Sequence, residues 1–111
     1  MKSFLLVFVQ LTPDRDKVLS LLDHARIVAN WMSLTGEVYV LVSDRTAADL
    51  RKMVYDRFPM AHYIVVELLP GHKDGRLYKA VWDFINNPTA AETGHPSGWN
   101  LLDFRPTPPK E

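Results

Sequence analysis

Two continuously apolar segments, residues 4–9 and 38–42, constrain the fold of this chain more than any other feature. Both are rich in β-branched and aromatic side chains and carry no run of alternating polar residues, a pattern typical of strands that are central in their sheet. A third β-rich segment, residues 63–69, ends at Pro70. We therefore expect a sheet with the first two segments at its centre.

The segment after the first strand predicts one helix and leaves its end open. Thr12 can cap this helix, Pro13 occupies its first turn, and apolar residues recur at helical spacing over residues 18–25. Residues 28–34 either extend the helix to a C-cap at Gly36 or form a strand that turns back into the next one. The periodicity is compatible with both interpretations.

Two more helices follow further along the chain. Residues 46–49 resemble a capping box with Asp49 in the place of Glu or Gln, and Pro59 closes the helix that it opens. After the loop at residues 71–75, the last helix ends at Asn86 to Pro88. The apolar residues that share one face of this last helix are Leu77, Tyr78, Val81, Phe84 and Ile85.

The interpretation of residues 28–34 decides the fold. A strand there gives the order β-α-β-β-α-β followed by a helix, a ferredoxin-like split βαβ arrangement. A helix there gives a small three-stranded parallel α/β layer instead. In the ferredoxin-like arrangement the first and third strands are central, which suits the two apolar segments. We predict a ferredoxin-like α+β fold with an extra C-terminal helix and an irregular tail.

Proline and glycine mark the end of the regular structure. Their concentration predicts one domain over residues 1–87 and a Pro- and Gly-rich tail over residues 88–111. Within the tail, Trp99, Leu101 and Phe104 would each forgo about 1.5–3 kcal/mol if left in water. We expect residues 99–104 to dock on the chain's own sheet or on the edge of a second copy.

Composition excludes several classes of protein. The chain has 13 Lys and Arg against 13 Asp and Glu and no cysteine, so neither a strongly basic surface nor a thiolate metal site or disulfide framework is expected. The apolar runs fall far short of the roughly 20 residues that span a membrane. The prediction is a cytoplasmic protein with no membrane partner.

One stretch resembles a known group of proteins. Residues 30–42 with Trp31, residues 46–51 with a Thr-Ala-x-x-Leu-Arg helix start, and residues 63–66 resemble small SinR-like bacterial proteins, relatives of the ferredoxin-like CRISPR-associated subunit of the spacer integrase. The resemblance covers roughly residues 3–69 and implies a ferredoxin-like homodimer. The relatives usually carry a metal-binding aspartate where this chain has Gln10, so we predict no metal-dependent nuclease activity.

The loop at residues 71–76 is the strongest local signal for ligand chemistry. His72, Lys73 and Arg76 lie between a strand and a helix, where backbone N–H groups and cations can hold an anion. The alternative is a solvated polar turn. Asp14 and Asp16 are interpreted as first-turn carboxylates that stabilise a helix, with Mg²⁺ binding as the alternative. We predict no catalytic residues, no metal site and no cofactor.

Three functions follow from these observations, in order. The first is a non-enzymatic homodimeric interaction module, with Trp31, Trp99, Leu101 and Phe104 as candidate interface residues and the tail as a possible contact to another protein. The second is a nucleic-acid-associated protein similar to the integrase subunit, which requires a local basic patch. The third is an anion- or small-molecule-binding enzyme that uses the loop at residues 71–76.

Overall fold

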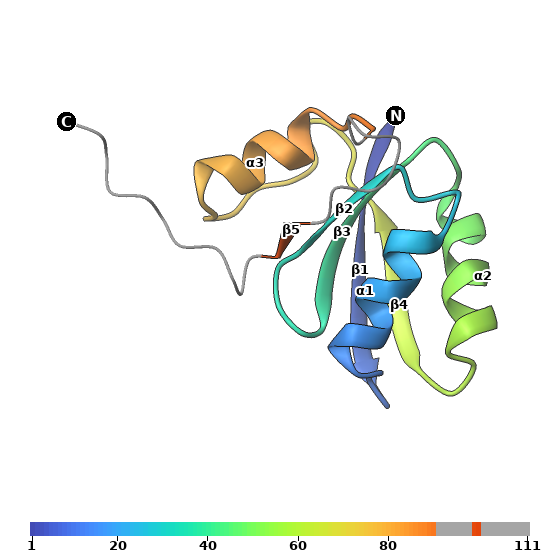
Figure 1. Cartoon of the computed structure of the whole chain (residues 1–111). Helices are drawn as coiled ribbons and strands as arrows, with labels where there is room; N and C mark the ends of the chain where they lie inside the picture. Colours follow the sequence, from blue (N-terminus) through green and yellow to red (C-terminus); the bar gives the residue numbers. More distant parts are fainter. Residues whose placement is uncertain (91–98, 101–111) are drawn as a thin grey trace.

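The computed structural model describes residues 1–90 and 99–100 of the chain. Helices α1 and α2 each lie between strands along the chain, and α3 stands apart from the other helices (Figure 1). The elements in chain order are β1 (Lys2–Gln10), α1 (Arg15–His24), β2 (Asn30–Ser33), β3 (Val38–Ser43), α2 (Ala47–Arg57), β4 (His62–Glu67), α3 (Lys79–Asn86) and β5 (Trp99–Asn100).

The strands form one sheet in the order β4-β1-β3-β2-β5. The pairs β1–β4, β1–β3 and β2–β3 are antiparallel, and β5 joins the edge of β2 in parallel. The apolar strands β1 and β3 are central, as their composition predicts. The chain is therefore an α+β protein with an antiparallel sheet, and the parallel three-stranded alternative is wrong.

Residues 30–33 form a strand and not the end of a long helix. Asn30 to Ser33 pair with β3 in the register Asn30↔Val42 to Ser33↔Tyr39. The turn between the two strands is closed by Thr35, whose hydroxyl accepts hydrogen bonds from the backbone N–H groups of Glu37 and Val38, each at 3.0 Å. The prediction of a hairpin at this place is confirmed.

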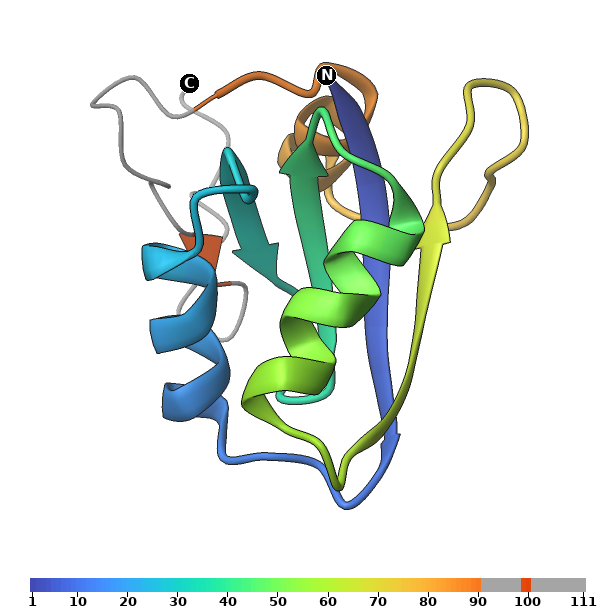
Figure 2. The same ribbon diagram turned by 90° about the vertical axis from the view of Figure 1, so that its right-hand side faces the viewer.

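Helices α1 and α2 cover one face of the sheet, with the strands behind them in Figure 2. Strand alternation sends Phe4, Leu6 and Phe8 of β1 to this face, where they form one core with buried residues of both helices. Helix α3 lies on the opposite face (Figure 1), where Val81 and Ile85 pack against β-strand residues in a second, smaller core. Two helices therefore cover one face of the sheet, and a single short helix covers part of the other.

Two helix starts differ from the sequence prediction. Asp14, in an extended conformation, is the N-cap of α1, so neither Thr12 nor Pro13 belongs to its first turn. Leu11, with a φ of 52°, adopts a left-handed backbone conformation in the segment between β1 and this N-cap. Similarly, extended Tyr78 is the N-cap of α3, which leaves Leu77 and Tyr78 outside the helix and exposed.

The capping box of α2 is present as predicted. The Thr46 hydroxyl accepts from the Asp49 backbone N–H at 3.1 Å, and the Asp49 carboxylate accepts from the Thr46 backbone N–H at 3.3 Å. Leu50 and Val54 of this helix and Phe58 at its C-cap are buried. Asp therefore performs the role that Glu or Gln has more often in this motif.

Across residues 1–90 and 99–100, no helix has the length and apolar character needed to cross a membrane.

Candidate functional site

The most distinctive surface is an apolar part of the sheet that α3 leaves uncovered. Val38, Val7 and Ile64 lie side by side on β3, β1 and β4, because Val7 pairs with both of the others. Val66 follows Ile64 on the same face of β4. Ile64 is 54% exposed and Val66 is 43% exposed, whereas Val7 and Val38 are partly buried. We call these four residues the open apolar face.

Helix α3 covers the other end of the same sheet face. Its buried residues Val81 and Ile85 pack with Met32 and Val40. The Ser3 hydroxyl donates a hydrogen bond to the Ile85 carbonyl oxygen at 2.7 Å and fixes the end of the helix to β1. Because α3 is short and held at this end, none of the helices in residues 1–90 shields the open apolar face.

Two exposed ion pairs lie on the helices. Lys52 pairs with Asp56 at 2.9 Å on α2, and Lys79 pairs with Asp83 at 2.7 Å on α3, both between successive turns and both exposed. No charged side chain interrupts the row from Val38 to Ile64. This surface is suited to an apolar partner and not to a polyanion.

The candidate interface residues do not share one position in the structure. Trp31 is only 5% exposed and belongs to the core under α1, with its indole N–H donating to the Asp23 carboxylate at 2.9 Å. Its side chain therefore packs within the chain. Trp99 begins β5 and pairs with Met32. Leu101 and Phe104 lie outside the described residues.

The residues of the loop at 71–76 do not converge on one place. Lys73 lines a hollow with Asp74 and Trp82, while Arg76 lines a different one beside Val81. The backbone N–H of residue 72 donates to the Leu69 carbonyl oxygen at 3.1 Å, and that of residue 75 donates to the Asp74 carboxylate at 2.7 Å. Two of the N–H groups that an anion would need are thus already used.

His72 is exposed and lines neither hollow. The three predicted anion ligands therefore form no shared cluster, and the arrangement resembles the solvated polar turn more than an anion site.

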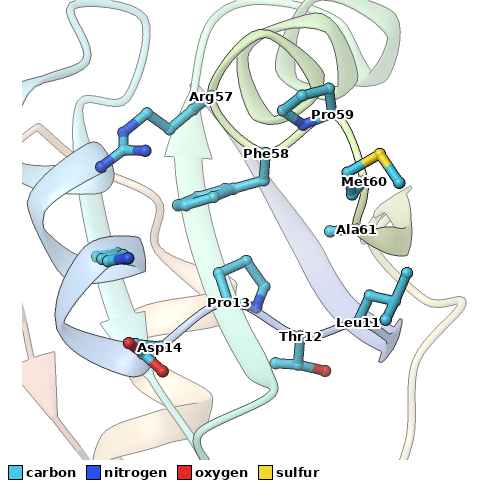
Figure 3. Close-up of a pocket in the computed structure, with 10 residues that line it drawn as sticks. Leu11, Thr12, Pro13, Asp14, Arg57, Phe58, Pro59, Met60 and Ala61 are labelled. Atoms are coloured by element: carbon cyan, nitrogen blue, oxygen red, sulfur yellow. The ribbon is translucent and has the colours of Figure 1, made fainter.

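A hollow of about 390 Å³ lies where β1, α1 and α2 approach one another (Figure 3). Asp14 is the carboxylate among its described lining residues, and Lys17 and Arg57 contribute two positive charges. Cations this near a single carboxylate oppose Mg²⁺ binding, since Mg²⁺ favours sites rich in negative oxygen ligands. Gln10, at the end of β1, contacts His62 through its side chain at 3.1 Å.

Metal ligands are not gathered elsewhere either. Within the described part of the chain, no three His, Cys, Asp or Glu side chains are grouped so as to hold a metal ion. The prediction that the chain lacks metal-dependent nuclease activity stays a prediction, and this arrangement of charges is in keeping with it.

Sequence reasoning did not identify the open apolar face. The signal was present, because β4 carries apolar residues on both faces, Tyr63 and Val65 on one and Ile64 and Val66 on the other. Such a strand is expected to be covered on both sides. Only the structure shows that it lies at an edge with one face uncovered by helices.

Comparison with known proteins adds no relative. No protein-family model, curated protein or solved structure matches the chain.

Proposed function

We propose that this protein is a non-enzymatic interaction module that forms a homodimer through the open apolar face. The observation that carries the proposal is the contiguous group of Val7, Val38, Ile64 and Val66 on a sheet face that α3 covers only in part. Contiguous exposed apolar surface on a folded protein commonly marks a binding site.

A second copy of the chain is the occupant that this surface fits. An apolar face is complementary to itself, and a two-fold axis through it would bring each valine row against its counterpart. The chain has no net charge at pH 7, so two copies do not repel each other over long distances.

We also propose that the fold is a ferredoxin-like arrangement. The strand order β4-β1-β3-β2, the antiparallel pairings and the position of α1 and α2 on one face support it. Such a fold agrees with the resemblance to SinR-like proteins and to the integrase subunit, which we keep as a proposal about ancestry.

The mass of the protein in solution tests the proposed dimer. Multi-angle light scattering of the full chain at high micromolar concentration should give twice the monomer mass of 12.7 kDa. Dilution should lower the mass, because a surface of few apolar residues gives limited affinity. A mass of 12.7 kDa throughout the range would contradict the proposal.

A further inference from the structure

A groove runs between α2 and β4 at the free edge of the sheet, on the side of the helices, and it reaches Ile64, the residue of the open apolar face that lies at this edge. In Figure 2, α2 lies in front of the sheet and β4 forms its edge. The groove has a volume of about 320 Å³. The small side chains of Ala47 and Ala48 in the first turn of α2 leave this space open. The lining residues are Ala47, Ala48, Arg51, Tyr63, Ile64 and Val65.

The backbone of β4 presents unused hydrogen-bonding groups beside this groove. The Leu68 backbone N–H donates to the Ser3 carbonyl oxygen at 2.8 Å. Because alternate residues of an antiparallel strand bond to the same neighbour, this bond fixes which residues of β4 face β1. The N–H and C=O groups of Tyr63, Val65 and Glu67 consequently point away from β1. In the described chain no strand pairs with β4 on that side.

Arg51 gives the groove a positive charge. Its backbone carbonyl oxygen accepts a hydrogen bond from the Tyr63 hydroxyl at 2.8 Å, which holds this turn of α2 against β4. Its guanidinium forms no ion pair with another residue of the described chain, whereas the neighbouring Lys52 pairs with Asp56 at 2.9 Å. A carboxylate in the groove would therefore meet a cation that these ion pairs do not use.

We propose that this groove binds an extended acidic peptide of another protein, which adds a strand to the free edge of β4. Main-chain hydrogen bonds to Tyr63, Val65 and Glu67 would supply the register, as in other cases of strand addition. Side chains on one face of the peptide would enter the space above Ala47 and Ala48, and a carboxylate would lie opposite Arg51. The partner is thus an apolar segment in β conformation with an aspartate or glutamate.

Selection from a peptide library tests this proposal without a known partner. The probe is a phage-displayed library of random peptides of about seven residues, the length of an ordinary strand, presented to the immobilised full chain. The enriched peptides should combine alternating apolar residues with an acidic residue. Synthetic versions should shift the amide resonances of Tyr63, Val65 and Glu67 in NMR spectra.

Matched variants separate the groove from the rest of the surface. Arg51→Glu should weaken binding of the selected peptides by about fivefold or more, the scale of reversing one exposed ion pair. Ala48→Glu should weaken it as well, because the new side chain fills the groove and repels a carboxylate. Lys52→Glu makes the same charge change one residue away from the groove and should leave the affinity within about twofold.

A third variant tests the main-chain contacts. Val65→Pro removes an N–H that points away from β1, a loss that an edge strand tolerates, and it also replaces a partly buried valine that packs against the core. It should weaken peptide binding while circular dichroism shows that the fold is kept. If Val65→Pro unfolds the chain, the Arg51→Glu and Ala48→Glu variants still test whether the peptides bind in the groove.

Several results would overturn the proposal. These are the absence of enrichment over an empty support, enrichment of peptides without acidic residues, equal effects of Arg51→Glu and Lys52→Glu, and resonance shifts confined to other elements. If the amide resonances of Tyr63, Val65 and Glu67 shift with protein concentration in the absence of peptide, a second copy of the chain pairs with this edge instead. Light scattering of the groove variants should still give the mass of the unmodified chain, so this test is independent of the proposed dimer.

Discussion

At the scale of single residues, Tyr39 links the core to the pH dependence of stability. Its ring is fully buried and its hydroxyl donates to the Gly36 carbonyl oxygen at 2.8 Å. Burial raises the pKa of Tyr39 to about 12, the nearby Arg15 charge opposes this rise, and Glu37 adds to it. The folded state therefore favours the neutral phenol, whose pKa in the unfolded chain is near 10.

This pKa shift predicts a loss of stability in alkaline solution. Because the folded pKa is the higher one, the contribution of Tyr39 is complete below pH 10 and disappears as the pH rises to about 12. The free energy of unfolding should fall by about 2–3 kcal/mol over this window on account of Tyr39. Urea unfolding of the unmodified chain and of Tyr39→Phe, compared at several pH values, measures the difference. If the free energy of unfolding falls equally steeply with pH in both proteins, the assignment of this loss to Tyr39 is wrong.

Trp31 gives a second prediction at this scale. Trp31→Phe removes the indole N–H that donates to Asp23 and leaves unfilled space under α1, which should lower the free energy of unfolding by about 1–3 kcal/mol. Asp23→Asn keeps an oxygen acceptor and should cost less than about 1 kcal/mol. Chemical denaturation of the two variants gives both values, and equal losses would show that the contact with the charged Asp23 carboxylate, and not the packing of the Trp31 ring, decides the loss.

At the scale of elements, β5 tests whether the tail protects an edge of the sheet. Trp99 and Asn100 pair with Met32 and Ser33 of β2, which would otherwise be an edge strand. Deleting residues 97–111 should lower the melting temperature by roughly 4–8 °C if it costs about 1 kcal/mol. Deleting residues 101–111 keeps β5 and is the control. Equal melting temperatures for the two truncated chains would mean that β5 adds nothing to stability.

The hydrogen bond between Ser3 and α3 gives another prediction for an element. Ser3→Ala leaves the Ile85 carbonyl oxygen without its partner at 2.7 Å and should destabilise the chain by about 1–2 kcal/mol. Hydrogen exchange should increase in α3 more than in α2, because the contact holds α3 alone. Uniform acceleration in both helices would contradict this local role.

Most elements of this fold could be predicted from the sequence, since each carries a local signal. Apolar β-rich runs located β1 and β3 at the centre, and the Thr46 to Asp49 motif located the start of α2. The apolar spacing of residues 28–34 suits a helix and a strand equally, so only their pairing with β3 identifies the strand. The starts of α1 and α3 follow the non-helical backbone angles of their N-caps, Asp14 and Tyr78, which no side-chain pattern reveals.

The candidate surface could be predicted less well than the fold. Its residues belong to β1, β3 and β4, and their adjacency follows from pairing between distant parts of the chain. For Trp31, the residue type suits a core and an interface alike, and the contacts with α1 place it in the core. Long-range geometry, and not residue type, decides both cases.

At the scale of the whole molecule, the account depends on the unequal cover of the two sheet faces. Helices α1 and α2 cover one face, and α3 covers only part of the other. If this asymmetry drives association, a charge in the open apolar face must disrupt the dimer, because burying an unpaired carboxylate between two copies is costly.

Sedimentation equilibrium of two matched variants measures this directly. Val66→Asp places a carboxylate in the open apolar face at a side chain that is 43% exposed, and it should shift the full chain to a mass of 12.7 kDa. Leu11→Asp makes a similar change at a residue that is 63% exposed and lies beside the hollow between α1 and α2, and it should keep the dimer mass. A Val66→Asp protein that is folded and still dimeric would contradict the account.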